Sequence, residues 1–383
     1  FEHGNPWLGS YCNAAALKHE FIALTPPAAA RTIRRLSGGV NLSIRSYLRA
    51  SPHVQVPVID FGPFLRAEPG ALELTATALR EASEDLGFYF IRDHGVTQSL
   101  IDRVFAETAR FHALPLERKL SVSVTDKVVG YLPEGGQRQR TSKYARSDHP
   151  DTSSSYYIRQ EFAPDHPDRL AGKPWVFENK WIADLPGFRE TMLEYYQAMT
   201  GLVLQILRVQ SVALGLAPDY LPQHPAFAPG VYNLRLLHYP PRERTLDGQF
   251  GIGPHTDYGH LTILAQGSVP GLEILTRDET WIEAPALSGH LLINNADLCS
   301  RWTNDRFRSA PHRVINKTGE TRYSIPFFTA SRSDVLLECL PTCHGPDNPP
   351  KYPPITAGEY FAAINRRNYD VLRADQATDD AMK

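Results

Sequence analysis

Cysteines and long apolar runs are both scarce in this chain of 383 residues. It contains four cysteines, which are Cys12, Cys299, Cys339 and Cys343. Four are too few for a disulfide framework in a chain of this length, which favours a reducing, cytoplasmic setting. No run of about 18 apolar residues occurs, so we expect no membrane-spanning helix.

Charge of one sign is not in excess either, because the formal net charge is −2. A nucleic-acid-binding surface normally requires a strong basic excess, so we expect no nucleic-acid partner. The sequence contains no detectable internal repeat. The hydrophobic content of 42% is ordinary for a globular protein and is enough for one large core or two modest ones.

Two of the cysteines, Cys339 and Cys343, lie close to His344 and could suggest zinc. The stretch around them is rich in proline, and no second ligand cluster follows at the spacing of a zinc finger. We therefore interpret this stretch as a proline-rich loop.

The chain divides into four parts by composition and pattern. We expect a divergent N-terminal extension, a helix-rich part, a β-rich core and a C-terminal loop with a helix, at residues 1–55, 56–228, 229–335 and 336–383. Within the extension, the proline pair after Thr25 predicts one short basic helix that ends near Gly38.

The helix-rich part opens with short strands in VPVIDF and FYFIRDHGV. Between them, apolar residues recur at helical spacing from Leu72 to Leu86, and Gly87 ends the pattern. Ser99 is a candidate cap for a second helix. The strongest helical pattern covers residues 188–215, and we expect this helix to support a sheet.

Residues 132–170 form the longest weakly patterned stretch, which is polar and rich in Gly, Ser and Pro. Such a segment is either a lid or substrate loop, or an exposed connection. After Pro229, short apolar runs separated by turn residues recur about every 8–12 residues, a pattern typical of an antiparallel sandwich or barrel. A final helix is predicted from Ala357 to Tyr369.

A His-x-Asp triplet occurs three times in the chain. The triplets that begin at His149 and His166 have a central proline and lie in polar sequence, so we interpret them as loop residues. His255 and Asp257 instead lead directly into the apolar run LTILAQ. Because residues i and i+2 of an extended chain share a side, both side chains can point to one metal ion.

His312 begins another predicted strand of the β-rich part and could supply a third ligand. Two histidines and one carboxylate leave open positions on a metal, as in non-haem Fe(II) oxygenases. The ligand types alone also permit zinc or manganese. The turn NKTGE predicts a hairpin that would place Arg322 and Ser324 beside the His312 strand. A buried guanidinium there needs an anion, and a dicarboxylate such as 2-oxoglutarate fits.

With these residues, the chain resembles the isopenicillin N synthase-like family of Fe(II)/2-oxoglutarate-dependent dioxygenases over about residues 56–370. The motifs that carry the resemblance are PVIDF, LGFYFIRDHGV, ALPLERK, LRLLHYPP, HTDYGHLTIL, APHRVIN and the RYS pair. The resemblance implies a mainly β fold, a double-stranded β-helix (jelly roll) core with flanking helices. It also implies an enzyme that binds Fe(II), 2-oxoglutarate, O2 and a small molecule, often as a monomer.

The resemblance assigns roles to individual residues. His255, Asp257 and His312 match the iron ligands. Arg322 and Ser324 match the pair that binds the distal carboxylate of 2-oxoglutarate, and Tyr239 matches a tyrosine that assists them. Phe328 matches an aromatic position that often faces substrate. We also predict that Tyr131 and Arg159 line the substrate pocket, whereas His94, His112 and His260 are structural.

One position departs from the family pattern. Plant relatives usually carry an asparagine two residues before the tyrosine, where this chain has Leu237. The departure leaves open an iron oxidase of the isopenicillin N synthase type that does not use 2-oxoglutarate. A jelly-roll binding module without catalysis is a further alternative. The resemblance implies oxidation of an unactivated C–H bond, by hydroxylation, desaturation or ring formation, in secondary metabolism.

Overall fold

The computed structural model describes residues 55–125, 128–137, 144, 149–228, 230–242 and 248–368. The predicted basic helix near residues 25–38, and all of the N-terminal extension except Gln55, lie outside these residues. Within the described part, none of the helices combines the length and the apolar character that crossing a membrane requires.

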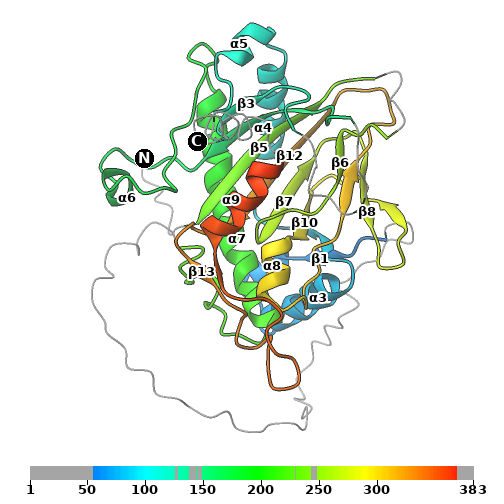
Figure 1. Ribbon diagram of the computed structural model, residues 1–383. Coiled ribbons are helices and arrows are strands. Elements are labelled where there is room, and N and C mark those ends of the chain that lie inside the picture. Colours follow the sequence, from blue (N-terminus) through cyan, green and yellow to red (C-terminus); the bar gives the residue numbers. More distant parts are fainter. Residues whose placement is uncertain are drawn as a thin grey trace, which may run out of the picture. The chain divides into compact units, whose positions relative to one another are not determined.

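An eight-stranded sheet forms the larger wall of the fold (Figure 1), and its strands follow the order β1-β2-β10-β7-β12-β5-β4-β3. Only the pair at one edge, β1 and β2, is parallel. The strands are β1 (Val58–Asp60), β2 (Phe88–Arg92), β3 (Gly130–Leu132), β4 (Ser154–Arg159), β5 (Val231–Tyr239), β7 (Leu261–Gln266), β10 (His290–Asn295) and β12 (Arg322–Ala330).

A four-stranded sheet faces the centre of the larger one, in the order β6-β11-β8-β9. Its strands are β6 (Ile252–His255), β8 (Leu272–Leu275), β9 (Trp281–Glu283) and β11 (His312–Val314). From β5 to β12 the chain changes sheet at every step except between β8 and β9. This alternation is the double-stranded β-helix, or jelly roll, that the sequence predicted. A short pair, β13 (Leu336–Leu337) with β14 (Ile355–Thr356), lies outside both sheets.

The predicted hairpin between the His312 strand and the Arg322 strand is wrong. β11 pairs with β6 and β8, whereas β12 pairs with β5 and β7. The turn after β11 therefore crosses from one sheet to the other, because a jelly roll closes by alternating its strands between walls. Arg322 consequently reaches the interior from the wall opposite His312.

Helices cover the outer face of the larger sheet, with α3, α4 and α7 supplying most of the contact (Figure 1). The helices are α2 (Gly62–Leu65), α3 (Ala71–Asp85), α4 (Gln98–His112), α5 (Leu116–Leu120), α6 (Pro167–Leu170), α7 (Phe188–Ala213), α8 (Asp297–Trp302) and α9 (Ala357–Asn368). A second apolar cluster fills the space between the two sheets. The central strands are thus buried on both faces, which explains why they read as continuous apolar runs.

Two details of the helix-rich part differ from the predictions. The second helix begins two residues earlier than expected, because its cap is Thr97 and not Ser99. The side chain of Thr97 accepts a bond from the backbone N–H of Leu100 at 3.4 Å. The stretch 132–170 contains β4, a buried strand of the larger sheet. Its sequence SSYYIR has small polar residues on both faces, so it lacks the apolar alternation that marks a strand.

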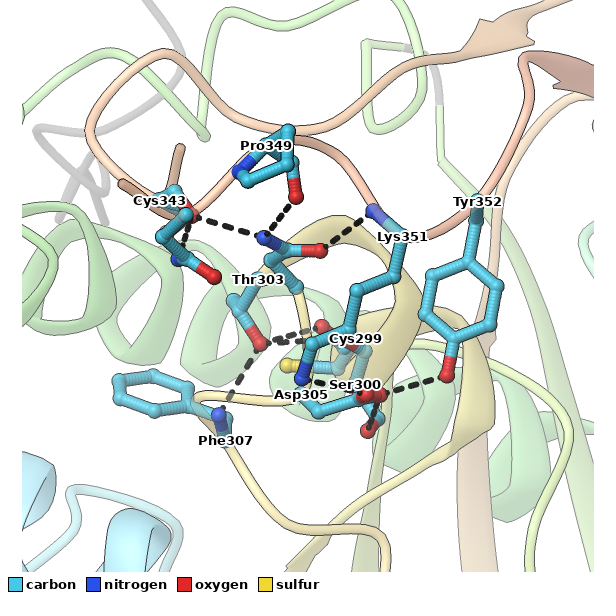
Figure 2. Close-up of polar contacts among 11 residues, drawn as sticks. Cys299, Ser300, Thr303, Asp305, Phe307, Cys343, Pro349, Lys351 and Tyr352 are labelled. Carbon is cyan, nitrogen blue, oxygen red and sulfur yellow. Dashed lines mark hydrogen bonds and ion pairs between the residues drawn. The ribbon is translucent and has the colours of Figure 1, made fainter. Parts of the chain in front are cut away.

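The C-terminal stretch that holds Cys339, Cys343 and His344 is fastened to the turn after α8. Asn304 donates to the carbonyls of Cys343 and Pro349, at 3.3 and 3.1 Å, and accepts from the N–H of Lys351 at 2.9 Å. Next to it, Asp305 binds Lys351 Nζ and the hydroxyl of Tyr352, at 3.0 and 2.7 Å (Figure 2). These bonds fix the segment that leads into α9.

Candidate metal centre

Two neighbouring strands of the smaller sheet place both histidines of the predicted site. His255 ends β6 and lies directly opposite His312 of β11 in the antiparallel register. Side chains of directly opposed residues point to the same face, and here that face is the interior of the jelly roll. The ring centroids are 4.3 Å apart.

Each imidazole is oriented by a hydrogen bond to the backbone carbonyl two residues before it in the chain. Nδ1 of His255 donates to the carbonyl of Gly253 at 2.8 Å, and Nδ1 of His312 donates to that of Ala310 at 3.2 Å. A proton on Nδ1 leaves the lone pair on Nε2, which is the atom that faces the interior. Both rings are therefore held in the tautomer that binds a metal.

Asp257 completes the group from the loop after β6. Its Oδ1 lies 3.7 Å from Nε2 of His255 and 3.8 Å from Nε2 of His312. Its Oδ2 accepts hydrogen bonds from Thr262 at 2.6 Å and from Asn294 at 2.8 Å. One carboxylate oxygen is thus held by the protein, while the other is directed at the imidazoles.

A glycine in the same loop allows it to lie against the larger sheet. A Cβ atom on Gly259 would come within 2.1 Å of the carbonyl oxygen of Thr329. That carbonyl accepts a bond from the N–H of His260 at 3.0 Å, and the carbonyl of Asp257 accepts one from the N–H of Asp297 at 2.8 Å. Close approach of the two backbones therefore requires glycine and fixes Asp257.

The protonation states suit metal binding. Burial lowers the pKa of His255 well below its usual value, and the neighbouring His312 lowers it further. Burial opposes ionisation of Asp257, but the two imidazoles and the bonds from Thr262 and Asn294 outweigh it, so its pKa is lowered. An unprotonated imidazole and a carboxylate are the forms that a divalent cation requires.

The donor atoms fit a divalent transition metal. One ligand atom from each of His255, Asp257 and His312 lies within 4.8 Å of the other two. Metal–ligand bonds of about 2.0–2.2 Å need little movement to close this triangle. All three ligands lie on one side, which leaves the other positions open, as in the facial arrangement of non-haem Fe(II) sites. Among the described residues no other cluster of three such side chains is found.

A buried cation lies in the same cavity as the triad. Arg322 is 1% exposed, and its Nε donates to the carbonyl of Val269 at 3.2 Å. Its Nη1 lies 3.4 Å from Ser324 Oγ, which lies 3.4 Å from the hydroxyl of Tyr239. No acidic side chain among the described residues forms an ion pair with Arg322. A buried guanidinium with only neutral neighbours favours an anionic ligand.

A second cavity, of about 310 Å³, opens on the other side of the metal site. The predicted substrate residues Phe328 and Arg159 line it. Tyr131 does not line it, because alternation along β3 turns its ring to the outer face of the sheet. There it packs at 5.9 Å from the ring of Phe111. We therefore do not propose Tyr131 as a substrate residue.

Comparison with known proteins identifies the family that has this arrangement of residues. The profile of the 2OG-Fe(II) oxygenase superfamily matches residues 231–331, and that of the non-haem dioxygenase N-terminal region, described from morphine synthesis, matches residues 56–184. A 2-oxoglutarate-Fe(II) type oxidoreductase of Emericella nidulans is 35% identical over 319 residues, which cover 82% of this chain and 90% of the relative. The chain belongs to the 2-oxoglutarate- and Fe(II)-dependent oxygenase superfamily.

Other relatives of this oxygenase agree. A 2-oxoglutarate-dependent dioxygenase of Talaromyces stipitatus is 34% identical over 294 residues, covering 74% of this chain and 89% of the relative. A Neurospora crassa protein solved with α-ketoglutarate and thymine superimposes with a TM-score of 0.71 at 30% identity, covering 83% of this chain and 98% of that chain. The oxygenase therefore uses Fe(II) and 2-oxoglutarate, and its fold is a jelly roll.

The sequence missed several residues of the oxygenase that the structure brings to the site. Thr262 and Asn294, which bind Asp257, carry no local signal because they lie on two further strands, β7 and β10. Arg235 lines both cavities, and its place two residues before Leu237 on the inner face of β5 could have indicated this. Leu237 itself is buried in the cavity wall opposite Ser324.

Proposed function

We propose that the protein oxidises a C–H bond of a small molecule bound in the 310 Å³ cavity. One observation carries this proposal. The cavity that contains Arg322 and the substrate-sized cavity share His255 and Asp257 in their linings, so both meet at the metal site. This placement gives a cosubstrate and a substrate separate approaches to one ion.

The cofactor pair supplies oxidation of the substrate by O2, coupled to conversion of 2-oxoglutarate to succinate and CO2. We assign His255, Asp257 and His312 to the iron. Arg322 and Ser324, with Tyr239 beside them, bind the distal carboxylate of 2-oxoglutarate. Phe328 and Arg159 contact the substrate. Asp257, His312, Arg322, Ser324 and Tyr239 are buried, which keeps bulk water from these groups and strengthens each charged contact.

We further propose that the substrate is a specialised metabolite, because sequence relatives of the chain include a kihadalactone A synthase of Citrus sinensis and an azadirone synthase of Melia azedarach. The oxidative outcome is hydroxylation, desaturation or ring formation. We also propose that the protein acts as a monomer in the cytoplasm.

A screen for substrate-stimulated succinate release tests the proposal. The purified protein with Fe(II), ascorbate and 2-oxoglutarate is offered candidate metabolites, and succinate and product mass are measured together. We expect one succinate for each substrate oxidised. Product formation without succinate would instead indicate a 2-oxoglutarate-independent oxidase. Failure to bind iron after anaerobic reconstitution would indicate a binding module.

A further inference from the structure

A patch of cationic and amide side chains lines the substrate cavity beside the metal site. On the inner face of β5, Arg235 and Asn233 are two residues apart, and Asn233 lies opposite Arg159 of the neighbouring strand β4. Opposed residues of adjacent strands have Cβ atoms about 4.5–5.5 Å apart. The patch therefore presents two guanidinium groups and an amide to one side of the cavity.

The guanidinium of Arg235 is held on the substrate side. It donates to Gln137 Oε1 at 2.8 Å, and its centre lies 4.7 Å from the ring centroid of Tyr157. Gln137 and Tyr157 line the substrate cavity but not the cavity of Arg322. These two contacts, with an amide oxygen and an aromatic ring, fix the orientation of a side chain that is only 5% exposed.

Arg159 is positioned in a similar way. Its backbone N–H and carbonyl both bind the side chain of Asn179 at 2.8 Å, and its guanidinium lies over the ring of Phe177 at 5.0 Å. Asp257 is the one acidic side chain among the described residues that line the cavity, and it faces the metal site. Among the described lining residues, two guanidinium groups thus stand beside a single carboxylate, and that carboxylate belongs to the metal site.

The rest of the lining is apolar and aromatic. Trp175, Phe177, Phe328 and Phe361 all contribute to it. If the carboxylate of a ligand binds the planar, forked donors of an arginine, the rest of that ligand would therefore pack against aromatic rings.

We infer that the substrate is an organic acid whose carboxylate is bound by Arg235, with Arg159 beside it. This inference rests on the proposed function, because it assigns the ligand of the same cavity. Arg235 is a specificity-determining residue in this account, and Arg322 keeps the separate task of binding 2-oxoglutarate.

Binding of matched pairs of compounds tests the inference without turnover. The protein is loaded anaerobically with Fe(II) and saturating 2-oxoglutarate, so that Arg322 is occupied. It is then offered a panel of small aromatic and aliphatic carboxylic acids, each paired with its primary amide, and dissociation constants are measured by equilibrium dialysis. We expect the acids that bind best to bind roughly 10- to 100-fold more tightly than their amides.

Variants identify the residue responsible. Arg235→Met should remove the preference for acids and leave the affinity for 2-oxoglutarate within about twofold. Arg235→Lys should keep part of the preference for acids, because the charge remains. Arg301→Met is the matched control, because Arg301 also stacks on a tyrosine, Tyr352, but lines neither cavity. Arg159→Met should reduce the preference by a smaller factor.

Several results would overturn the inference. These are tight binding of the amides, no binding by any acid of the panel, and an acid preference that survives in Arg235→Met. A loss of 2-oxoglutarate affinity in Arg235→Met that matches its loss of acid affinity would reassign Arg235 to the cosubstrate. The wild-type comparison holds even if a variant does not fold. Failure of the wild type to bind 2-oxoglutarate would instead overturn the proposed function itself.

Discussion

The two carboxylate oxygens of Asp257 have different partners, and this division orients the side chain. Oδ2 accepts hydrogen bonds from Thr262 and Asn294, which fix the rotamer of the side chain. Oδ1 therefore points at the histidines before a metal binds. Partners of this kind commonly change metal affinity by about 10- to 100-fold when they are removed. The neighbours of Asp257 should therefore matter nearly as much as the ligand.

Asn294→Ala tests this at the scale of one hydrogen bond. We expect Fe(II) affinity to fall by about tenfold, because Asp257 loses one of the bonds that direct it. Anaerobic Fe(II) titration measures the change. The neighbouring Asn295 contacts Gln210 and not Asp257, so Asn295→Ala is the control. Equal losses of affinity in both variants would indicate a general effect on stability instead.

Arg322 should determine the affinity for the cosubstrate. Replacing it by methionine removes the charge of a side chain that is 1% exposed, so we expect 2-oxoglutarate affinity to fall by roughly 10- to 100-fold while Fe(II) affinity is retained. Titration of the anaerobic Fe(II) protein with 2-oxoglutarate measures this. Arg103→Met removes a surface arginine paired with Glu194 and should change nothing. Unchanged affinity in Arg322→Met would contradict the assignment.

At the scale of elements, the turn after α8 anchors the chain that leads into α9, whose Gly358 and Phe361 line the substrate cavity. Asn304 makes three bonds to this chain and has a φ of 56°, a left-handed conformation that asparagine tolerates better than alanine. Both features bear on the stability of the C-terminal segment.

Asn304→Ala should lower the free energy of unfolding by about 2–4 kcal/mol, through lost hydrogen bonds and backbone strain. Asn304→Gly should be less destabilising by about 1 kcal/mol, because glycine adopts this φ without strain. Urea unfolding measures both, and limited proteolysis should cut first within residues 336–356. Asn316→Ala, at an exposed turn, is the control. Equal stability of the alanine variant and the wild type would show that the anchor is unimportant.

The sequence predicted elements better than their pairing. Strong periodicity located α3 and α7, and the apolar runs located the jelly-roll strands from β5 to β12. β4 escaped detection because SSYYIR carries serines on both faces. The hairpin of His312 with Arg322 was wrong because a short turn between two strands looks the same whether they share a sheet or cross between sheets.

The spacing of His255 and Asp257 was informative because it is local. His312 and Arg322 were predicted from neighbouring strands of the β-rich part, and the family motifs then assigned their roles. Thr262, Asn294 and Arg235 could not be found in this way. They lie at the site only because of the order in which the strands pair in the larger sheet, and no local sequence pattern encodes that order.

At the scale of the whole molecule, buried histidines should make stability depend on pH. Burial lowers the pKa of His112 and His260 to about 3, and that of His238 to about 4. In the unfolded chain each of them binds a proton near pH 6.5. The unfolded state therefore holds more protons below that pH, so stability is complete above it and is lost as the pH falls toward these lower values.

We expect the free energy of unfolding to fall by several kcal/mol between about pH 7 and pH 5, at roughly 1 kcal/mol or more for each such histidine. Urea unfolding of the metal-free protein at both pH values measures it. His260→Gln should reduce the dependence, because it removes one of the buried imidazoles. Stability that does not change over this range would contradict the account.

The most direct test of the central claim is an anaerobic titration with Fe(II) and then 2-oxoglutarate, followed by visible absorption. The claim is that His255, Asp257 and His312 bind one iron whose open positions accept the cosubstrate. The account predicts one Fe(II) for each chain, a charge-transfer band that appears only with 2-oxoglutarate, and neither in Asp257→Ala. A wild-type protein without the band, or an Asp257→Ala variant that binds iron as tightly as the wild type, would contradict it.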